Sequence, residues 1–204
     1  MKSLLSLFLG LFVFATSALA EEVAPDALVK GVTTDVLTIV RQDKDIQNGN
    51  SKRVIELVET KVLPHFDFSR MAALALGREW KKASPEQKKR LTEEFRTLLV
   101  RTYSNALTGY KNQTVVYKPF KMQAGEADVL VKTEVRQPGA QAIPLDYSLE
   151  KQGDGWKVYD VIVGGISLVT NYRESFAQEV RSGGIDGLIQ SVANKNKQLE
   201  AGKK

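Results

Sequence analysis

The segment SPEQKKRLTEEFRTLLVRTYSNALTGY, residues 84–110, predicts a helix longer than most in a domain of this size and so decides how the rest must pack. Ser84 is a suitable N-cap, Pro85 can take the first helical position without losing a hydrogen bond, and Gln87 completes a capping box. A helix of about 25 residues would be about 38 Å long, and it needs a large apolar partner. Its expected packing face repeats at spacings of three and four and consists of Leu91, Phe95, Leu98, Leu99, Thr102, Tyr103, Ala106, Leu107 and Tyr110.

Three shorter helices are predicted before this segment. The first starts at Pro25, the second is capped by Ser51 and ends before Pro64, and the third opens at Asp67 or Ser69 and ends at Gly77. The third is apolar on nearly every side, so we expect it to be buried. The apolar stripes of the first two are Leu28, Val32, Val36, Ile39 and Val40, and Val54, Ile55, Val58 and Val62.

After Asn112 the apolar period changes from 3.6 to 2, which indicates β-strands. Four strands are expected, and turn signals at 137–139 and 153–155 join them through short connections. Such connections are too short for parallel crossovers, so the sheet should be antiparallel. Helices return at 172–181 and 185–198, and the polar tail from Asn194 is expected to fray. The strand signals are 114–117, Val129 to Val135, Leu145 to Leu149, and Trp156 to Ile162.

Helices followed by a meander and more helices predict an α+β fold, with helices packed on a curved antiparallel sheet. Residues 1–20 resemble a secretory signal peptide, with Lys2, an apolar run and a small-residue cleavage site at Ala18-Leu19-Ala20. We therefore expect cleavage after Ala20 and a single exported domain over residues 21–204. No later segment is long and apolar enough to span a bilayer.

Composition excludes several classes of site. The chain has no cysteine and a single histidine, His65, so neither a disulfide framework nor a zinc or iron centre is expected. After loss of Lys2, 28 basic residues would face 24 acidic ones. That excess suits loose contact with anionic membranes or acidic partners, or it is an ordinary solubilising surface. The lysine and arginine residues at 81–90 lack interleaved aromatic residues, so we interpret them as a solvated face rather than a nucleic-acid site.

Catalytic signatures are weak. Gly165-Ile166-Ser167 begins like a nucleophile elbow but lacks the second glycine, and His65 is remote in the sequence. Asp146 and Asp160 lie on predicted strands, where they are expected to be solvated; a buried general base would be the alternative. Three readings stay open from the residues alone: a binder with an apolar cavity, an isomerase-like enzyme on a cone-shaped fold, and an adaptor with a solid core.

Two regions together resemble the MlaC family, the periplasmic phospholipid carriers also called toluene-tolerance auxiliary proteins. The likeness covers nearly all of the expected mature chain, with the motifs in the same order and spacing. Its first region carries Asp67-Phe68, Met71-Ala72, Leu76-Gly77, Trp80, residues 83–87, Phe95, Leu98-Leu99 and Thr102-Tyr103; its second carries residues 156–161, 165–168, Asn171-Tyr172-Arg173 and Phe176.

The resemblance implies a cystatin- or NTF2-like sheet backed by helices, with a deep apolar pocket for the acyl chains of a phospholipid. It implies a non-enzymatic periplasmic carrier with no cofactor beyond that cargo, which contacts membranes transiently. The implied partners are an outer-membrane lipoprotein–porin complex and an inner-membrane ABC transporter with an MCE-domain protein, and no nucleic acid. The lining that we expect consists of Leu74, Leu98, Leu99, Tyr103, Tyr147, Val163, Ile166 and Leu168. Asp160, Tyr172 and Arg173 are expected to be scaffold residues or partner contacts.

Overall fold

The computed structural model describes residues 23–153 and 155–202, and within them it confirms the α+β fold. The expected signal peptide, residues 1–20, lies outside the described residues. The helices are α1 (Pro25–Gln42), α2 (Lys44–Gln47), α3 (Ser51–Lys61), α4 (Phe68–Leu76), α5 (Pro85–Tyr103) and α6 (Arg173–Ala201). Short 3₁₀ turns are η1 (Leu63–His65), η2 (Gly77–Lys81), η3 (Ser104–Leu107) and η4 (Thr170–Tyr172).

The sheet is an antiparallel meander in the order β1-β2-β3-β4-β5, as the short connections predict. Its strands are β1 (Thr114–Tyr117), β2 (Asp128–Arg136), β3 (Ile143–Gln152), β4 (Gly155–Val163) and the unexpected β5 (Ile166–Ser167). The register pairs Val131 with Tyr147 and Tyr147 with Val161, so these apolar side chains share one face. The pairing shifts by one residue where Ser148 faces Asp160 and Leu149 faces Val158, which marks a β-bulge.

Helix α5 begins as the sequence predicts but is shorter than expected. The Ser84 hydroxyl accepts a hydrogen bond from the Gln87 backbone N–H, and the Gln87 side chain accepts one from Ser84 N–H. The α-helix ends at Tyr103 after 19 residues, and the chain tightens into the 3₁₀ turn η3. Ser104 and Asn105 stand at this change, and both residue types favour turns over helix interiors because their side chains compete for backbone hydrogen bonds.

Two further helix boundaries differ from expectation. The cap of α3 is Asn50, whose side chain accepts a hydrogen bond from Arg53 N–H, so Ser51 is the first helical residue. The C-terminal segment does not fray at Asn194, because α6 continues to Ala201. The buried Asn196 side chain donates to the Glu94 backbone oxygen on α5 at 2.9 Å, and this contact holds the polar tail against the neighbouring helix.

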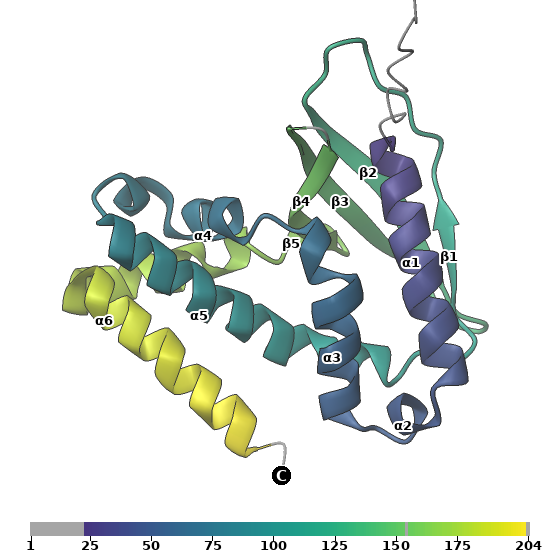
Figure 1. The fold of residues 1–204 in the computed structure, drawn as a ribbon, viewed down its shortest axis with the longest axis horizontal. Helices are drawn as coiled ribbons and strands as arrows, with labels where there is room; N and C mark the ends of the chain where they lie inside the picture. Colours follow the sequence, from purple (N-terminus) through teal and green to yellow (C-terminus); the bar gives the residue numbers. More distant parts are fainter. Residues whose placement is uncertain (1–22, 154, 203–204) are drawn as a thin grey trace, which may run out of the picture.

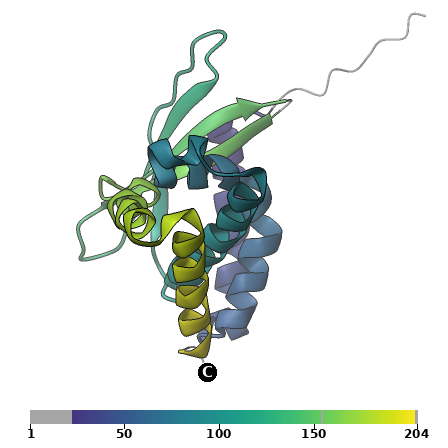
Figure 2. The ribbon, with the colours of Figure 1, turned by 90° about the vertical axis from the view of Figure 1, so that its left-hand side faces the viewer.

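The molecule has two parts that meet along the start of α4. Helices α4, α5 and α6 form a layer at one side, while α1 and α3 stand by the sheet (Figure 1; Figure 2). Phe66 forms a bridge with Val158 of β4, and Asp67 N–H donates to the Val158 oxygen at 2.9 Å. Arg70 of α4 stacks on Tyr159 with its guanidinium carbon 3.5 Å from the ring centroid and pairs with Asp128 and Glu150. These contacts connect the helical layer to the sheet.

Candidate functional site

Buried apolar residues form three clusters rather than one continuous core. The first cluster joins α4, α5 and α6. The second joins α1, α2 and α3 and includes Val100 of α5. The third joins Val29 of α1 to the sheet. The first consists of Met71, Ala72, Ala75, Leu76, Leu91, Phe95, Leu98, Leu99, Val169, Phe176, Leu188, Ile189 and Val192. The second adds Val36, Val40, Ile46, Val54, Leu57 and Val58, and the third Val129, Val131, Leu149, Trp156 and Val158.

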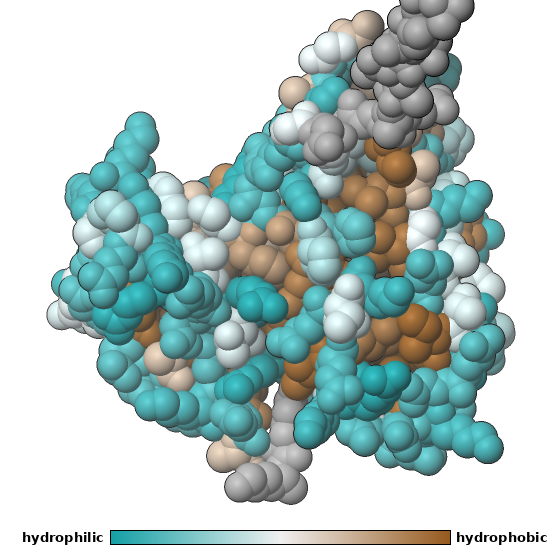
Figure 3. All heavy atoms as spheres, in the orientation of Figure 1, coloured by the Kyte–Doolittle hydropathy of each residue, from teal (hydrophilic) through white to brown (hydrophobic). Residues whose placement is uncertain are grey.

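Half-buried apolar side chains pack against the second and third clusters, and we call a set of them the central seam. Figure 3 shows apolar surface on both sides of α3, toward α1 and toward α5. Apolar groups that remain accessible beside buried clusters are typical of a ligand-binding cleft. The seam consists of Leu28, Val32 and Ile39 of α1, Ile55 of α3, Val62, Leu63, Phe66, Leu107, Tyr117, Tyr147 and Val161.

Two tyrosine hydroxyls lie where the seam meets the sheet, and both stay uncharged. Tyr147 lies under α1, and its hydroxyl is hydrogen-bonded to Thr33. Burial raises the pKa of Tyr147 to about 12 and also raises the pKa of Tyr117. The Tyr117 side chain is hydrogen-bonded to Thr33 as well. Both phenols are therefore neutral at physiological pH. Neutral hydroxyls can accept or donate hydrogen bonds to an ester or a head group without the cost of burying a charge.

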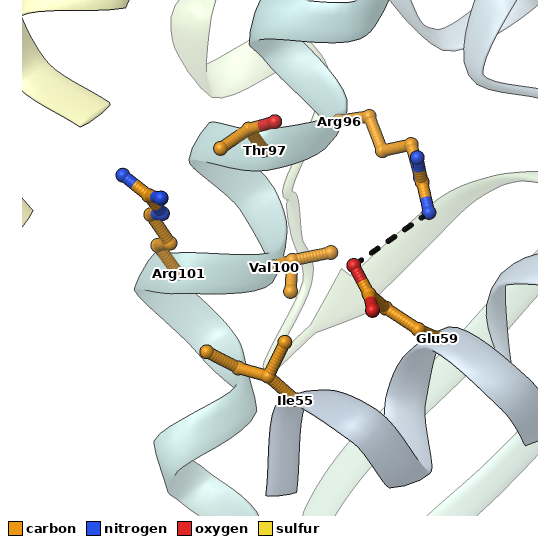
Figure 4. Close-up of a pocket in the computed structure, with 6 residues that line it drawn as sticks. All are labelled: Ile55, Glu59, Arg96, Thr97, Val100 and Arg101. Atoms are coloured by element: carbon orange, nitrogen blue, oxygen red, sulfur yellow. Dashed lines mark ion pairs between the residues drawn. The ribbon is translucent and has the colours of Figure 1, made fainter. Parts of the chain in front are cut away.

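A hollow of about 200 Å³ opens between α3 and α5, next to the seam (Figure 4). Ile55 and Val100 form its apolar base, and Thr97 lies on the same side of α5. Its rim is charged: Arg96 pairs with Glu59 at 3.9 Å, and Arg101 also lines the hollow. A second hollow of about 280 Å³ lies near the start of α1, lined by Ala24, Met122, Gly125, Glu126, Lys151 and Trp156.

Both hollows are smaller than typical ligand pockets, which measure about 300–1,000 Å³. A two-chain lipid would therefore have to separate the elements that meet at the seam.

The structure distributes the eight expected lining residues over three places. Leu98 and Leu99 are buried in the first cluster, and Leu74 and Tyr103 pack against it. Tyr147 belongs to the seam.

The other three lie around the turn between β4 and β5. Val163 is paired with Ile166 and their exposed fractions are 37% and 62%, while half-buried Leu168 donates its N–H to the Val161 oxygen. Sequence reasoning missed the α1 and α3 members of the seam, Val32, Ile39 and Ile55. The sequence feature that could have revealed them is the width of the apolar stripe of α1, which has more apolar positions than one buried face needs.

The residues expected to be scaffold do make structural contacts. Asp160 is buried, which corrects the expectation of a solvated strand residue: its carboxylate accepts a hydrogen bond from Val169 N–H at 3.3 Å and orders the chain after β5. Burial raises the pKa of Asp160. Tyr172 packs edge-on against Phe95 at 5.2 Å between centroids, and Arg173 donates to the Leu74 backbone oxygen at 3.0 Å.

No group of three or more potential metal-ligating side chains is found among residues 23–153 and 155–202. Over the same ranges, every helix is too short or too polar to cross a membrane.

Comparisons with known proteins agree with this architecture. The family model for the MlaC protein matches residues 30–194. Toluene tolerance protein Ttg2D of Pseudomonas putida is 30% identical over 163 residues, which cover 79% of this chain and 75% of that protein. The intermembrane phospholipid transport system binding protein MlaC of Haemophilus influenzae is 26% identical over 192 residues, covering 92% and 88%.

A solved structure extends the likeness to three dimensions. The phospholipid-binding protein from Ralstonia solanacearum, in complex with a phospholipid, is 41% identical, with a TM-score of 0.79. The match covers 86% of this chain and 98% of that one. The family model, the two relatives and the shared fold all support the resemblance that the sequence motifs indicate. This chain belongs to the MlaC family.

Proposed function

We propose that this protein is a periplasmic phospholipid carrier that holds the acyl chains of one lipid in the central seam. The observation that supports this most directly is an apolar seam in a chain that is 41% identical to a protein solved with a phospholipid. The relative named as a binding protein of an intermembrane phospholipid transport system supports a role in transport. Carriage, rather than catalysis, also fits the neutral hydroxyls beside the seam.

The proposed lining extends from the seam in two directions. Tyr147 forms part of the sheet wall, and Val163 lies on the same face one pair further along, next to Ile166 and Leu168. Leu74, Leu98, Leu99 and Tyr103 belong to the α4–α6 layer and would meet the lipid where that layer separates from the sheet.

Energetics favour a shuttle that never releases its cargo into water. Burying about 30 methylenes at about 0.8 kcal/mol each corresponds to about 24 kcal/mol relative to water, which exceeds the affinities that noncovalent complexes reach. When the lipid moves directly from one apolar environment to another, its acyl chains never enter water, so this free-energy cost does not arise. We therefore propose direct exchange with membrane-embedded partners, an outer-membrane lipoprotein–porin complex and an inner-membrane ABC transporter with an MCE-domain protein, with maintenance of outer-membrane lipid asymmetry as the result.

Mass spectrometry of lipid extracted from the purified protein tests the proposal. We expect about one phospholipid per protein, and a strong reduction in Val32→Glu, which introduces a charge into the seam. The matched control is Val23→Glu, because Val23 is 57% exposed and precedes α1. Lipid-free wild-type protein, or Val32→Glu that folds and retains a full complement of lipid, would overturn the seam as the binding site.

A further inference from the structure

The connection between α4 and α5 carries a concentrated positive charge, which we call the basic corner (residues 78–90). It contains six cationic side chains, Arg78, Lys81, Lys82, Lys88, Lys89 and Arg90, and two acidic ones, Glu79 and Glu86. The net charge of these thirteen residues is therefore +4, whereas the whole chain carries +5. Nearly all of the excess positive charge is thus concentrated on one short segment.

Local ion pairs neutralise little of this charge. Lys82 pairs with Glu79 at 2.8 Å, and the Lys88 ammonium lies 5.6 Å from the Trp80 ring centroid. Lys81, Lys89 and Arg90 are exposed to solvent. Their charges therefore contribute to a positive potential that extends outward from the corner.

The position of these cations works against helix stability. Lys81 and Lys82 precede the Ser84 cap of α5, and Lys88 and Lys89 follow in its first two turns. The N-terminus of a helix carries a partial positive charge and favours acidic residues, not basic ones. Basic residues near this end add to the positive potential of the helix dipole, so the corner attracts anions.

The shape of the basic corner favours a flat binding partner, such as a membrane surface, over a narrow one. The corner is the tip of the helical layer opposite α1 and β1, and its surface is hydrophilic and convex (Figure 1; Figure 3). Long lysine side chains on a protruding tip can contact many head groups of a planar surface at once. Trp80, half-buried beside Lys88, is the type of residue that settles at the water–lipid boundary.

We propose that the basic corner docks this protein on anionic phospholipid bilayers. This site differs from the central seam: it recognises phosphate charge on the membrane surface, and the seam holds acyl chains. Docking through the tip leaves α1, α3 and the seam accessible. The inference goes beyond cargo binding and holds whether or not cargo is exchanged at the same membrane.

Vesicle co-sedimentation tests the proposal with protein purified together with its cargo. The probes are vesicles of phosphatidylcholine mixed with phosphatidylglycerol, and vesicles of phosphatidylcholine alone. We expect binding to the anionic vesicles only, weakening as salt rises. Each basic residue near an anionic surface contributes about fivefold in affinity, so Lys81→Gln/Lys89→Gln/Arg90→Gln should bind about 100-fold more weakly.

The matched control is Lys44→Gln/Lys52→Gln/Lys61→Gln, which removes the same charge from exposed positions on α2 and α3. We expect it to bind like the wild type, and both variants to keep the wild-type melting temperature and bound lipid. Equal losses in the two triple variants would show that only net charge matters and would overturn the proposal. It would also be overturned by equal binding to neutral vesicles, or by no vesicle binding at low salt, which would point to an acidic protein partner instead.

Discussion

Asp160 shows at the scale of one residue that residue type alone is a poor guide to burial. A carboxylate on a strand is usually solvated, but Asp160 is in step with Trp156 and Val158 along β4, and it is buried. The hydrogen-bond partner of its carboxylate is the Val169 N–H, in the chain after β5, and the sequence does not show that this segment reaches Asp160. Asp67 is the contrasting case: it was one of two expected starts for α4, and its side chain caps that helix.

The raised pKa of Asp160 predicts a pH-dependent cost to stability. Because burial raises the pKa above its ordinary value of 3.8, ionisation is less favourable in the folded protein than in the unfolded chain. This contribution to stability is present below the ordinary pKa and is lost as pH rises through the raised value. In Asp160→Asn the loss should be absent, so urea unfolding should show the stability of the variant rising relative to that of the wild type as the pH increases above about 4. Parallel pH profiles would contradict this assignment.

Arg70 is a second residue whose effect can be measured. Its guanidinium pairs with Asp128 and Glu150 and covers the Tyr159 ring, so it connects α4 to three strands. We expect Arg70→Ala to lower the free energy of unfolding by about 1–3 kcal/mol, because it removes a stacked guanidinium and leaves two carboxylates without their partner. Arg181→Ala, at an exposed position on α6, is the control and should change stability by less than about 0.5 kcal/mol. A similar small effect at Arg70 would mean that the connection is not energetically important.

At the scale of elements, the sequence predicts most helices and strands because their signals are local. The capping box of α5, the proline at the start of α1 and the glycine that ends α4 all lie where the patterns place them. The two-residue strand β5 was missed because so short a strand depends on pairing with β4 and not on its own pattern. The two helical segments expected near the C-terminus are one helix, α6, with a kink at Gly184.

The kink in α6 can be tested with adjacent glycines. Gly184 has φ +67° and ψ −172°, a conformation almost restricted to glycine, while the φ of Gly183 is not positive. Gly184→Ala should therefore lower the free energy of unfolding by about 1–3 kcal/mol. Gly183→Ala should be neutral or stabilising by up to about 1 kcal/mol, because a methyl group there meets no atom within 4 Å. Chemical denaturation distinguishes them, and equal effects would show that α6 straightens at no cost.

At the scale of the whole molecule, the sequence indicates a surplus of apolar residues but not where they gather. The sequence predicts that the apolar helices pack on the curved sheet. The structure divides the buried core into three clusters, with the seam packed against two of them. The difference is one of tertiary packing, since Val36 is buried and Val32, one turn away on the same stripe, is only half-buried. Periodicity identifies the face of a helix but not how closely a neighbour covers it.

This division predicts that bound lipid stabilises the molecule unevenly. Acyl chains in the seam would contact α1, α3 and the sheet, whereas the α4–α6 layer has its own cluster, with Leu188 and Phe95 completely buried. A ligand that binds only the folded state raises stability, and its contacts protect the elements that it touches. Hydrogen exchange should therefore show faster exchange in α1, α3 and β1 after delipidation, with α5 and the second half of α6 little changed. Uniform acceleration across all helices would mean that the three clusters unfold as one unit, and slower exchange in α1 would place the cargo elsewhere.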